Sequence, residues 1–231
     1  MLSGLVLRLR ADTGVTQSAG LTSAWGDLSS GSGVTVTQGT GANQVTWLQN
    51  GWPNGNPCFS TVDVNRSMST PVNAITIGVF SLFVIARYTA AGEMFCHGSS
   101  AGGTNVGTQF YTSTGASCAI NRGGSTLASN RDVSTNWAVD AVTPHLYAWT
   151  FDGTNAGSIA WKDGVAQSMT NLTTHDPGTS AFARTGIVFN YDGGTLAPLG
   201  LTAEYLLFNR VVSSQEMGMI HAYSQQFWGT P

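Results

Sequence analysis

The chain has 231 residues and a formal net charge of −3; only 9% of its residues are charged, and 29 are glycines. This length suits one large all-β domain, because sandwiches and barrels often exceed about 200 residues as single units. The sequence contains no cluster of Lys and Arg. Nucleic-acid binding and polybasic attachment to membranes both depend on clustered cations, so we expect neither.

The first predicted strand lies at the N-terminus. In Leu5–Asp12, leucines at alternate positions are separated by Val6 and Arg8 and followed by Arg10. Alternation with a period of two indicates a strand with one buried face, here the face that carries the leucines. The segment has no basic start, apolar run or small-residue cleavage site, so we expect no signal peptide and synthesis in the cytoplasm.

Short strand-like runs then recur along the chain, separated by turns of Gly, Asn, Asp and Pro. The run FSLFVIARY at 80–88 is apolar almost throughout, which is typical of a central strand covered on both faces. The longest apolar stretch, Ile75–Ala86, falls far short of the roughly 20 residues that a membrane helix needs, so we expect no membrane insertion. The other predicted strands are Val34–Thr37, Val45–Leu48, Cys58–Val62, Glu93–His97, Gln109–Thr112, Cys118–Asn121, His145–Phe151, Ser158–Trp161, Gly186–Tyr191 and Leu201–Phe208.

These strands and one helix define the expected fold. About a dozen short strands with frequent turns predict a two-sheet antiparallel β-sandwich. The helix is expected at about 213–228, because Ser213 and Glu216 have the spacing of a capping box and apolar residues recur every three or four positions from Met217 to Phe227. We find no internal repeat or linker, and we expect residues 1–231 to form one domain.

Catalytic motifs are weak in this sequence. A glycosidase needs two carboxylates that flank the scissile bond, but Glu93, Glu204 and Glu216 do not belong to a Glu-x-Asp-x-Glu strand. Glu216 is accounted for by the capping box, and Glu204 is expected to have a structural partner. The G-x-S-x-G match at 98–102 lacks the following helix that a serine hydrolase requires. We therefore expect no catalytic residue and no enzyme.

Metal-binding patterns are equally weak. The three cysteines are widely spaced and are expected to pack as small apolar residues; they are Cys58, Cys96 and Cys118. The four histidines have no metal-ligand spacing and are expected at the surface or in hydrogen bonds; they are His97, His145, His175 and His221.

Calcium is the one ion for which the sequence offers oxygen ligands. Asp-Gly pairs occur at 152–153, 163–164 and 192–193, and Asn190 precedes the last pair. Asp-Gly is also the usual chemistry of hairpin turns, and that interpretation is the simpler one. A rim aspartate with Asn190 and loop carbonyls is the alternative, a Ca²⁺ site. We expect no cofactor, with Ca²⁺ as the only candidate.

The seven tryptophans divide into two groups. One group has apolar strand-like or helix-like neighbours and is expected in the core: Trp25, Trp47, Trp149 and Trp228. The other group has loop or edge neighbours: Trp52, Trp137 and Trp161. An exposed indole offers a rigid platform on which a sugar ring stacks. The members of the second group are the candidate ligand-binding residues, with partly covered core aromatics as the alternative.

Several segments share features with one fold family. They are LRLRADTGV (Leu7–Val15), AWGDLSSGSG (Ala24–Gly33), NGNPCFSTVD (Asn54–Asp63), FSLFVIARY (Phe80–Tyr88), WTFDG (Trp149–Gly153), AWKDGVA (Ala160–Ala166) and AEYLLFNRVVSSQEMGMIHAYSQQFWG (Ala203–Gly229). In this order they resemble the laminin-G-like jelly-roll domains of the concanavalin A-like superfamily. The chain departs from that family at Asp163-Gly164, in place of an Asn-Gly turn, and at APLG (Ala197–Gly200). The resemblance implies a concanavalin A-like sandwich; it implies little about function, because such domains bind sugars or proteins.

Together these features favour a non-enzymatic surface or binding domain. A sandwich poor in lysine, rich in small polar residues and without a signal peptide suits a bacteriophage virion surface, as a capsid decoration, fibre or tail adhesin module. Its partners would be other virion proteins, further copies of itself as a homo-oligomer, and cell-surface glycans bound weakly. The alternative is a carbohydrate-binding module of a larger secreted protein, and the third hypothesis is a divergent glycoside hydrolase.

Overall fold

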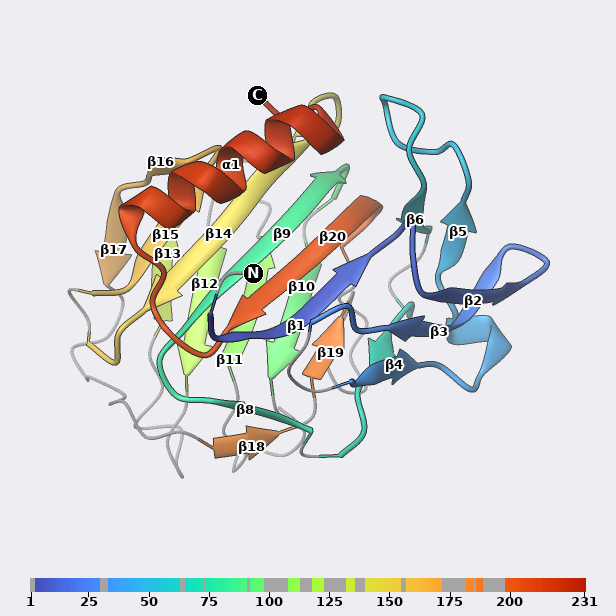
Figure 1. The fold of residues 1–231 in the computed structure, drawn as a ribbon, viewed down its shortest axis with the longest axis horizontal. Coiled ribbons are helices and arrows are strands. Elements are labelled where there is room, and N and C mark those ends of the chain that lie inside the picture. The colour runs from blue at the N-terminus through green and yellow to red at the C-terminus, as the bar shows by residue number, and fades with distance from the viewer. Residues whose placement is uncertain are drawn as a thin grey trace.

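A computed structural model describes residues 3–29, 33–62, 65–72, 74–90, 92–97, 108–112, 118–122, 132–135, 140–154, 157–171, 182–184, 186–188 and 198–231. Antiparallel strands form two facing layers, and the C-terminal helix α1 lies across the outer face of one of them (Figure 1). The predicted all-β sandwich with one C-terminal α-helix is thereby confirmed.

The layer next to α1 is the helix-side sheet. Its strands pair in the order β1 (Leu5–Arg10), β20 (Gly200–Phe208), β9 (Phe80–Tyr88), β14 (His145–Phe151), β15 (Ile159–Lys162) and β16 (Val165–Ala166). The start of β20 also pairs with β6 (Cys58–Thr61), which in turn pairs with β5 (Thr46–Leu48).

The second layer contains the strands on the far side of the sandwich. They pair in the order β17 (Met169–Asn171), β13 (Asp132–Thr135), β12 (Cys118–Arg122), β11 (Thr108–Thr112), β10 (Gly92–His97), β19 (Gly186–Val188), β7 (Met68–Ser69), β4 (Thr35–Thr37), β3 (Leu21–Gly26) and β2 (Val15–Ser18). A pairing between β3 and β5 joins the two layers. A separate pair is formed by β8 (Ile75–Ile77) and β18 (Phe182–Arg184), and a short 3-10 helix spans Gly41–Asn43.

Each predicted strand is found, with bounds that differ by one or two residues where both ends are described; the end of the predicted run 186–191 lies outside the described residues. The sequence patterns missed several short strands, including β2 and β3. The VTQS sequence of β2 has no apolar alternation and three of its residues are exposed, so a hydrophobic pattern cannot reveal it.

The central strand β9 is covered on both faces, as its sequence predicted. Phe80, Leu82 and Val84 point into the inner core between the two layers. Phe83 and Ile85 point the other way, into an outer core beneath α1. All of these side chains are at most 1% exposed, and burying each one contributes about 1.5–3 kcal/mol to folding.

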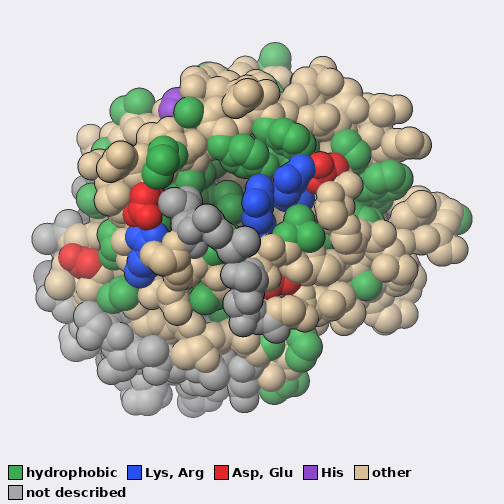
Figure 2. Space-filling view, in the orientation of Figure 1, with side chains coloured by type: hydrophobic (Ala, Val, Ile, Leu, Met, Phe, Trp, Pro, Cys, Tyr) green, Lys and Arg blue, Asp and Glu red, His purple; other side chains and the backbone are tan. Residues whose placement is uncertain are grey.

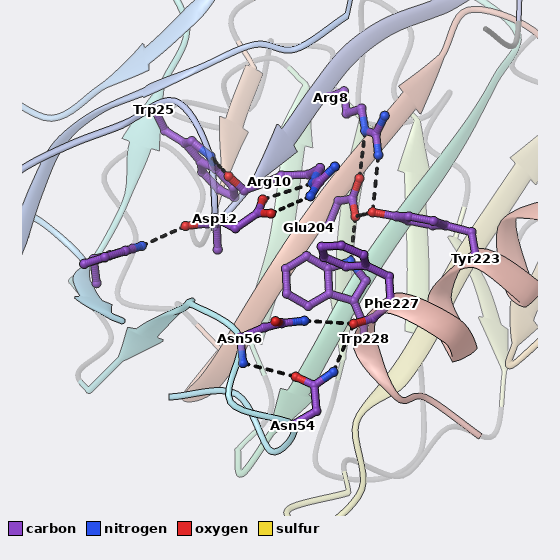
Figure 3. A network of polar contacts seen from close by, with 12 residues as sticks. Arg8, Arg10, Asp12, Trp25, Asn54, Asn56, Glu204, Tyr223, Phe227 and Trp228 are labelled. Atoms are coloured by element: carbon purple, nitrogen blue, oxygen red, sulfur yellow. Dashed lines mark hydrogen bonds and ion pairs between the residues drawn. The ribbon is translucent and has the colours of Figure 1, made fainter. Parts of the chain in front are cut away.

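The face that β1 buries differs from the prediction at one position. Leu7 and Leu9 lie in the inner core, but Leu5 packs against the outer core. The pairing of β1 with β20 shifts register between Leu5 and Leu7, and an irregularity of that kind turns the preceding side chain to the opposite face. Arg8 and Arg10 therefore lie on the helix side of the sheet (Figure 3).

Helix α1 spans Ser214–Trp228, 15 residues, and begins at the predicted capping box. The Ser213 hydroxyl accepts from the backbone N–H of Glu216 at 3.2 Å, and the Glu216 carboxylate accepts from the backbone N–H of Ser213 at 2.9 Å. Gly229, with φ of 70°, ends the helix in the left-handed conformation that favours glycine. In the described part of the chain, no helix has the length and hydropathy needed to span a membrane.

The C-terminal end of α1 is held by the loop between β5 and β6. The indole N–H of Trp52 donates to the Trp228 carbonyl at 2.6 Å. The side-chain amides of Asn54 and Asn56 donate to the Phe227 carbonyl at 2.9 and 2.8 Å (Figure 3). The last carbonyls of a helix have no partner within the helix. This loop satisfies two of them and thereby fixes the helix against the sheet.

A buried carboxylate on β20 connects the sheet to the same helix. Glu204 is 0% exposed and accepts three hydrogen bonds: from Tyr223 Oη at 2.6 Å, from Trp228 Nε1 at 2.7 Å and from Arg8 Nε at 2.9 Å (Figure 3). Burial and the adjacent Glu204 charge raise the pKa of Tyr223, so its hydroxyl stays a donor. The expectation that Glu204 has a structural partner is confirmed.

Replacing Glu204 with Gln should lower the free energy of unfolding by about 3–5 kcal/mol, the usual result of removing one partner from a buried ion pair. The amide loses the negative charge that pairs with Arg8 and turns an NH₂ group towards other donors. Urea unfolding at neutral pH measures the change. The matched control is Asp12→Asn, which removes a carboxylate paired with Arg10 at 21% exposure and should cost at most about 1 kcal/mol. Similarly small losses in both variants would contradict the anchoring role of Glu204.

A second ion pair ties the start of α1 to the loop before it. Arg210 donates to both carboxylate oxygens of Glu216, at 2.5 and 2.7 Å. These hydrogen bonds, together with the backbone N–H of Ser213, lower the pKa of Glu216 from 4.5 to about 2. A carboxyl group with a lowered pKa stabilises the fold above its ordinary pKa, and this contribution is lost as the pH falls towards 2.

Glu216→Gln should therefore be less stable than the parent protein at pH 7, and the difference should shrink between about pH 5 and pH 2. Glutamine also completes a capping box, so the variant keeps the cap and loses only the titrating group and its ion pair. Thermal melts across that pH range measure the difference in melting temperature. A difference that stays constant down to pH 2 would show that Glu216 does not contribute to acid sensitivity.

Candidate functional site

The candidate ligand-binding tryptophans have three different outcomes. Trp52 is 2% exposed, and its ring packs edge-on against Trp228 at a centroid distance of 5.9 Å. It offers no open ring face, so its assignment as a sugar platform is wrong; the indole serves the end of α1 instead. Trp137 lies outside the described residues. Trp161 is half-buried against the outer core, and its N–H donates to Thr150 Oγ1 at 3.2 Å.

The expected core tryptophans also need one correction. Trp25, Trp149 and Trp228 are 0% exposed, as predicted. Trp47 is only half-buried: it packs against the inner core and is one of the residues that line an open depression. The apolar neighbours of Trp47 in the sequence led to its assignment to the core. The polar segment Gln49-Asn50-Gly51, which follows Trp47 closely, is the sequence feature that could have indicated the depression.

The depression beside Trp47 has a volume of about 440 Å³ and is open to solvent. It is lined by Gln17, Gly20, Trp47, Leu48, Gln49, Asn50 and Gly51. None of these lining residues carries a charge. Small ligands generally occupy sites of about 300–1,000 Å³, so the depression has room for a ligand of a few sugar rings.

Two hydrogen bonds and one strand pairing position Trp47. Its backbone N–H donates to the Gly20 carbonyl at 2.8 Å, and its indole N–H donates to the Ala11 carbonyl at 2.7 Å. The same residue pairs across the strands with Phe59 of β6. A tryptophan whose backbone N–H and indole N–H are both hydrogen-bonded loses little conformational freedom when a ligand binds.

The amide side chains around the depression are oriented by backbone groups. Gln17 Oε1 accepts from the backbone N–H of Gly20 at 2.9 Å, so its NH₂ group faces away from that contact. The Asn50 amide finds hydrogen-bond partners when it is oriented so that its nitrogen donates to the carbonyls of Gln49 and Gly55, both at 3.1 Å. Its oxygen then remains an acceptor. Gln17 therefore offers a donor and Asn50 an acceptor, and both residues line the depression.

The adjoining loop is tightly packed. A side chain at Gly51 would place a Cβ 2.5 Å from Leu48 Cβ and 2.7 Å from Cys58 Sγ. Cys58 is buried, as predicted, and burial raises the pKa of its thiol to about 12. The thiol is therefore unreactive at neutral pH, and glycine at 51 is required for the close approach of the loop to β6.

A second hollow lies between α1 and the helix-side sheet. Its volume is about 260 Å³, and its walls are mostly apolar; they include Leu5, Leu206, Phe208, Met219, Ile220 and Tyr223. Arg8 lies at this hollow with its guanidinium bound to Glu204. The space-filling view shows hydrophobic side chains gathered on this face beside basic ones (Figure 2).

The described carboxylates and histidines are engaged in structural contacts. The ring of His145 is held between Asp163 Oδ2, 2.6 Å from Nδ1, and Asp140 Oδ2, 3.1 Å from Nε2. The other oxygen of Asp163 accepts from the backbone N–H of Leu146 at 2.9 Å. Within the described ranges, no group of three or more His, Cys, Asp or Glu side chains could hold a metal ion.

The Asp-Gly pairs that the structure describes serve turns. Asp163 and Gly164 both have positive φ, 50° and 74°, as the two-residue hairpin between β15 and β16 requires. Asp152 Oδ1 accepts from the backbone and hydroxyl of Thr154 at 2.8 and 2.7 Å. Asn190 and the pair at 192–193 lie outside the described residues.

No protein-family model and no curated protein sequence matches the chain. Solved structures do match it. A Trypanosoma rangeli sialidase in complex with sialic acid aligns over 100% of this chain and 34% of its own, at 14% identity and a TM-score of 0.61. The binding domain of Paraclostridial Mosquitocidal Protein 1 aligns over 99% of this chain and 55% of its own, at 11% identity and a TM-score of 0.66.

These similarities establish a shared fold. At such identities they show the β-sandwich alone, and the chain spans about a third of the sialidase and about half of the mosquitocidal binding domain. The β-sandwich itself is shown; its placement in the concanavalin A-like superfamily, and more narrowly among laminin-G-like domains, stays a prediction.

The comparisons correct one expectation. The domain was expected to belong to a non-enzymatic class, but its whole length aligns with sialidases, which are enzymes. The expectation that the chain is no enzyme is therefore contradicted. The expectation rested on the absence of a paired-carboxylate motif and kept a divergent glycoside hydrolase as the third hypothesis, since one fold serves proteins with different chemistry.

Removal of divalent metal ions tests the expectation that the chain has no cofactor. We expect EDTA to leave the melting temperature unchanged, because the Asp152 and Asp163 oxygens described above already bind protein donors. A ligand that binds only the native state raises its stability by mass action. A fall of several degrees in EDTA, reversed by Ca²⁺ and not by Mg²⁺, would show a calcium site.

Proposed function

We propose that the chain is a carbohydrate-binding module of a larger protein and that the depression beside Trp47 binds the glycan. The observation that carries this proposal is a half-buried tryptophan, fixed through its indole N–H, that lines an open and uncharged depression together with Gln and Asn residues. Aromatic rings give sugar recognition a large rigid contact area, and amides supply both donors and acceptors for hydroxyl groups.

The similar structures support this proposal. One of them is a sialidase in complex with sialic acid, and another is named as a binding domain. The chain spans about a third of the sialidase, which suits a module within a longer protein. The virion-surface role and the virion partners stay predictions from composition.

The composition of the depression also sets the expected strength of binding. With no charged side chain in its wall, the site relies on contact area, shape and hydrogen bonds. We expect a monomer to bind a glycan weakly, with a Kd in roughly the millimolar range, and several copies on one particle to bind much more strongly through multivalency. Affinity should change little with salt, because screening weakens interactions between charges.

Trp47→Ala should weaken glycan binding about tenfold or more, because it removes the rigid ring. The test is a glycan array probed with the protein displayed on a multivalent carrier, followed by NMR titration of the oligosaccharides that bind. Trp47→Phe keeps a ring and loses the bond to the Ala11 carbonyl, so an intermediate loss is expected.

Trp161→Ala is the matched control, since Trp161 is also half-buried but does not line the depression. Melting temperatures of all variants separate loss of binding from loss of folding. If Trp161→Ala abolishes binding and Trp47→Ala leaves it intact, the glycan site is at Trp161, the candidate retained from the sequence. If no oligosaccharide binds the parent protein, the proposed function is wrong.

A further inference from the structure

The hydrogen-bonding atoms of the depression discriminate between kinds of sugar. The NH₂ group of Gln17 is the donor, because the backbone N–H of Gly20 holds the other end of the amide. The Asn50 oxygen is the acceptor, because its nitrogen donates to two backbone carbonyls. Since backbone contacts determine both orientations, neither amide can turn over without losing a hydrogen bond.

Sugar hydroxyl groups offer both of the partners that these two amides require. Each hydroxyl has one hydrogen to donate and two lone pairs to accept. In a complex we expect one hydroxyl to accept from Gln17, an adjacent one to donate to Asn50, and the ring face to pack on Trp47. A carboxylate has no hydrogen to donate, so it satisfies only the Gln17 half of this pair and faces the Asn50 oxygen without compensation.

The charges near the depression do not favour an anion. Its wall contains no cation among the described residues. The indole N–H of Trp47 donates to the carbonyl of Ala11. The charged residues on either side of Ala11 are Arg10 and Asp12, and they form an ion pair with each other. Strong recognition of a carboxylate uses charge-assisted hydrogen bonds from Arg or Lys, and the chain as a whole has a net charge of −3.

From these observations we infer that the depression selects uncharged sugars with adjacent hydroxyl groups over acidic sugars such as sialic acid. This inference rests on the proposed glycan-binding function and names its ligand class. The inferred ligand class also differs from the ligand of the sialidase whose fold the chain shares, because that structure is a complex with sialic acid.

The test compares a neutral oligosaccharide, lactose, with the same oligosaccharide carrying a terminal sialic acid, by NMR titration. We expect lactose to bind at least about threefold more tightly than the sialylated form. Gln17→Glu keeps the acceptor for Gly20 but replaces the donor with a carboxylate oxygen. It should weaken lactose binding about three- to tenfold, the value of one hydrogen bond.

The matched control is Gln215→Glu, which makes the same change on an exposed residue in the first turn of α1. That turn lies across the molecule from β2 and β5 (Figure 1), so this variant should bind lactose like the parent protein. Equal losses in both glutamate variants would show a general charge effect and overturn the role of Gln17.

The remaining outcomes separate the two claims. If the sialylated sugar binds as tightly as lactose or more tightly, and Trp47→Ala abolishes that binding, the ligand class is wrong while the glycan-binding function stands. If the glycan array and both titrations show no binding by the parent protein, the proposed function fails and the inference fails with it.

Discussion

The carboxylate of Glu204 has no exposure to solvent, and the outer half of the structure depends on how it is satisfied. An unpaired buried charge would cost several kcal/mol. Here Arg8 supplies the opposite charge from the neighbouring strand, and Tyr223 and Trp228 supply hydrogen bonds from α1. Because two of the three donors come from the helix, the carboxylate favours one position of α1 on the sheet.

That position determines which surfaces remain for binding. With α1 in place, the outer face of the helix-side sheet becomes a second core, and Trp52 is used to hold the end of the helix. The loop that contains Trp52 also provides one wall of the depression beside Trp47. The helix anchor and the candidate site are therefore connected through a few consecutive residues, and loosening the end of α1 should also loosen that wall.

Local patterns were sufficient to predict much of the fold. The Ser213 and Glu216 spacing located the start of α1, and the apolar run at 80–88 identified a strand covered on both faces. The register shift in β1 was not predictable, because it depends on pairing with β20: Leu7 and its partner Leu207 are 200 residues apart in the chain.

The candidate site was harder to predict than the fold for the same reason. Trp52 has loop neighbours in the sequence, but its partner Trp228 is 176 residues away, and no local pattern reports that contact. Trp47 lies in an apolar strand, but its position near the junction of β2, β3 and β5 leaves the residue partly accessible. Exposure at an edge between two layers is a property of the assembled sandwich.

The central claim is that a glycan binds at Trp47, and the indole N–H signals of the seven tryptophans test it directly. After assignment in a ¹⁵N-labelled sample, each indole reports on its own surroundings during a titration with a neutral oligosaccharide. The account predicts that the Trp47 signal shifts progressively and saturates, while those of the buried Trp25, Trp149 and Trp228 stay in place. A saturable shift at another indole with none at Trp47 would contradict it.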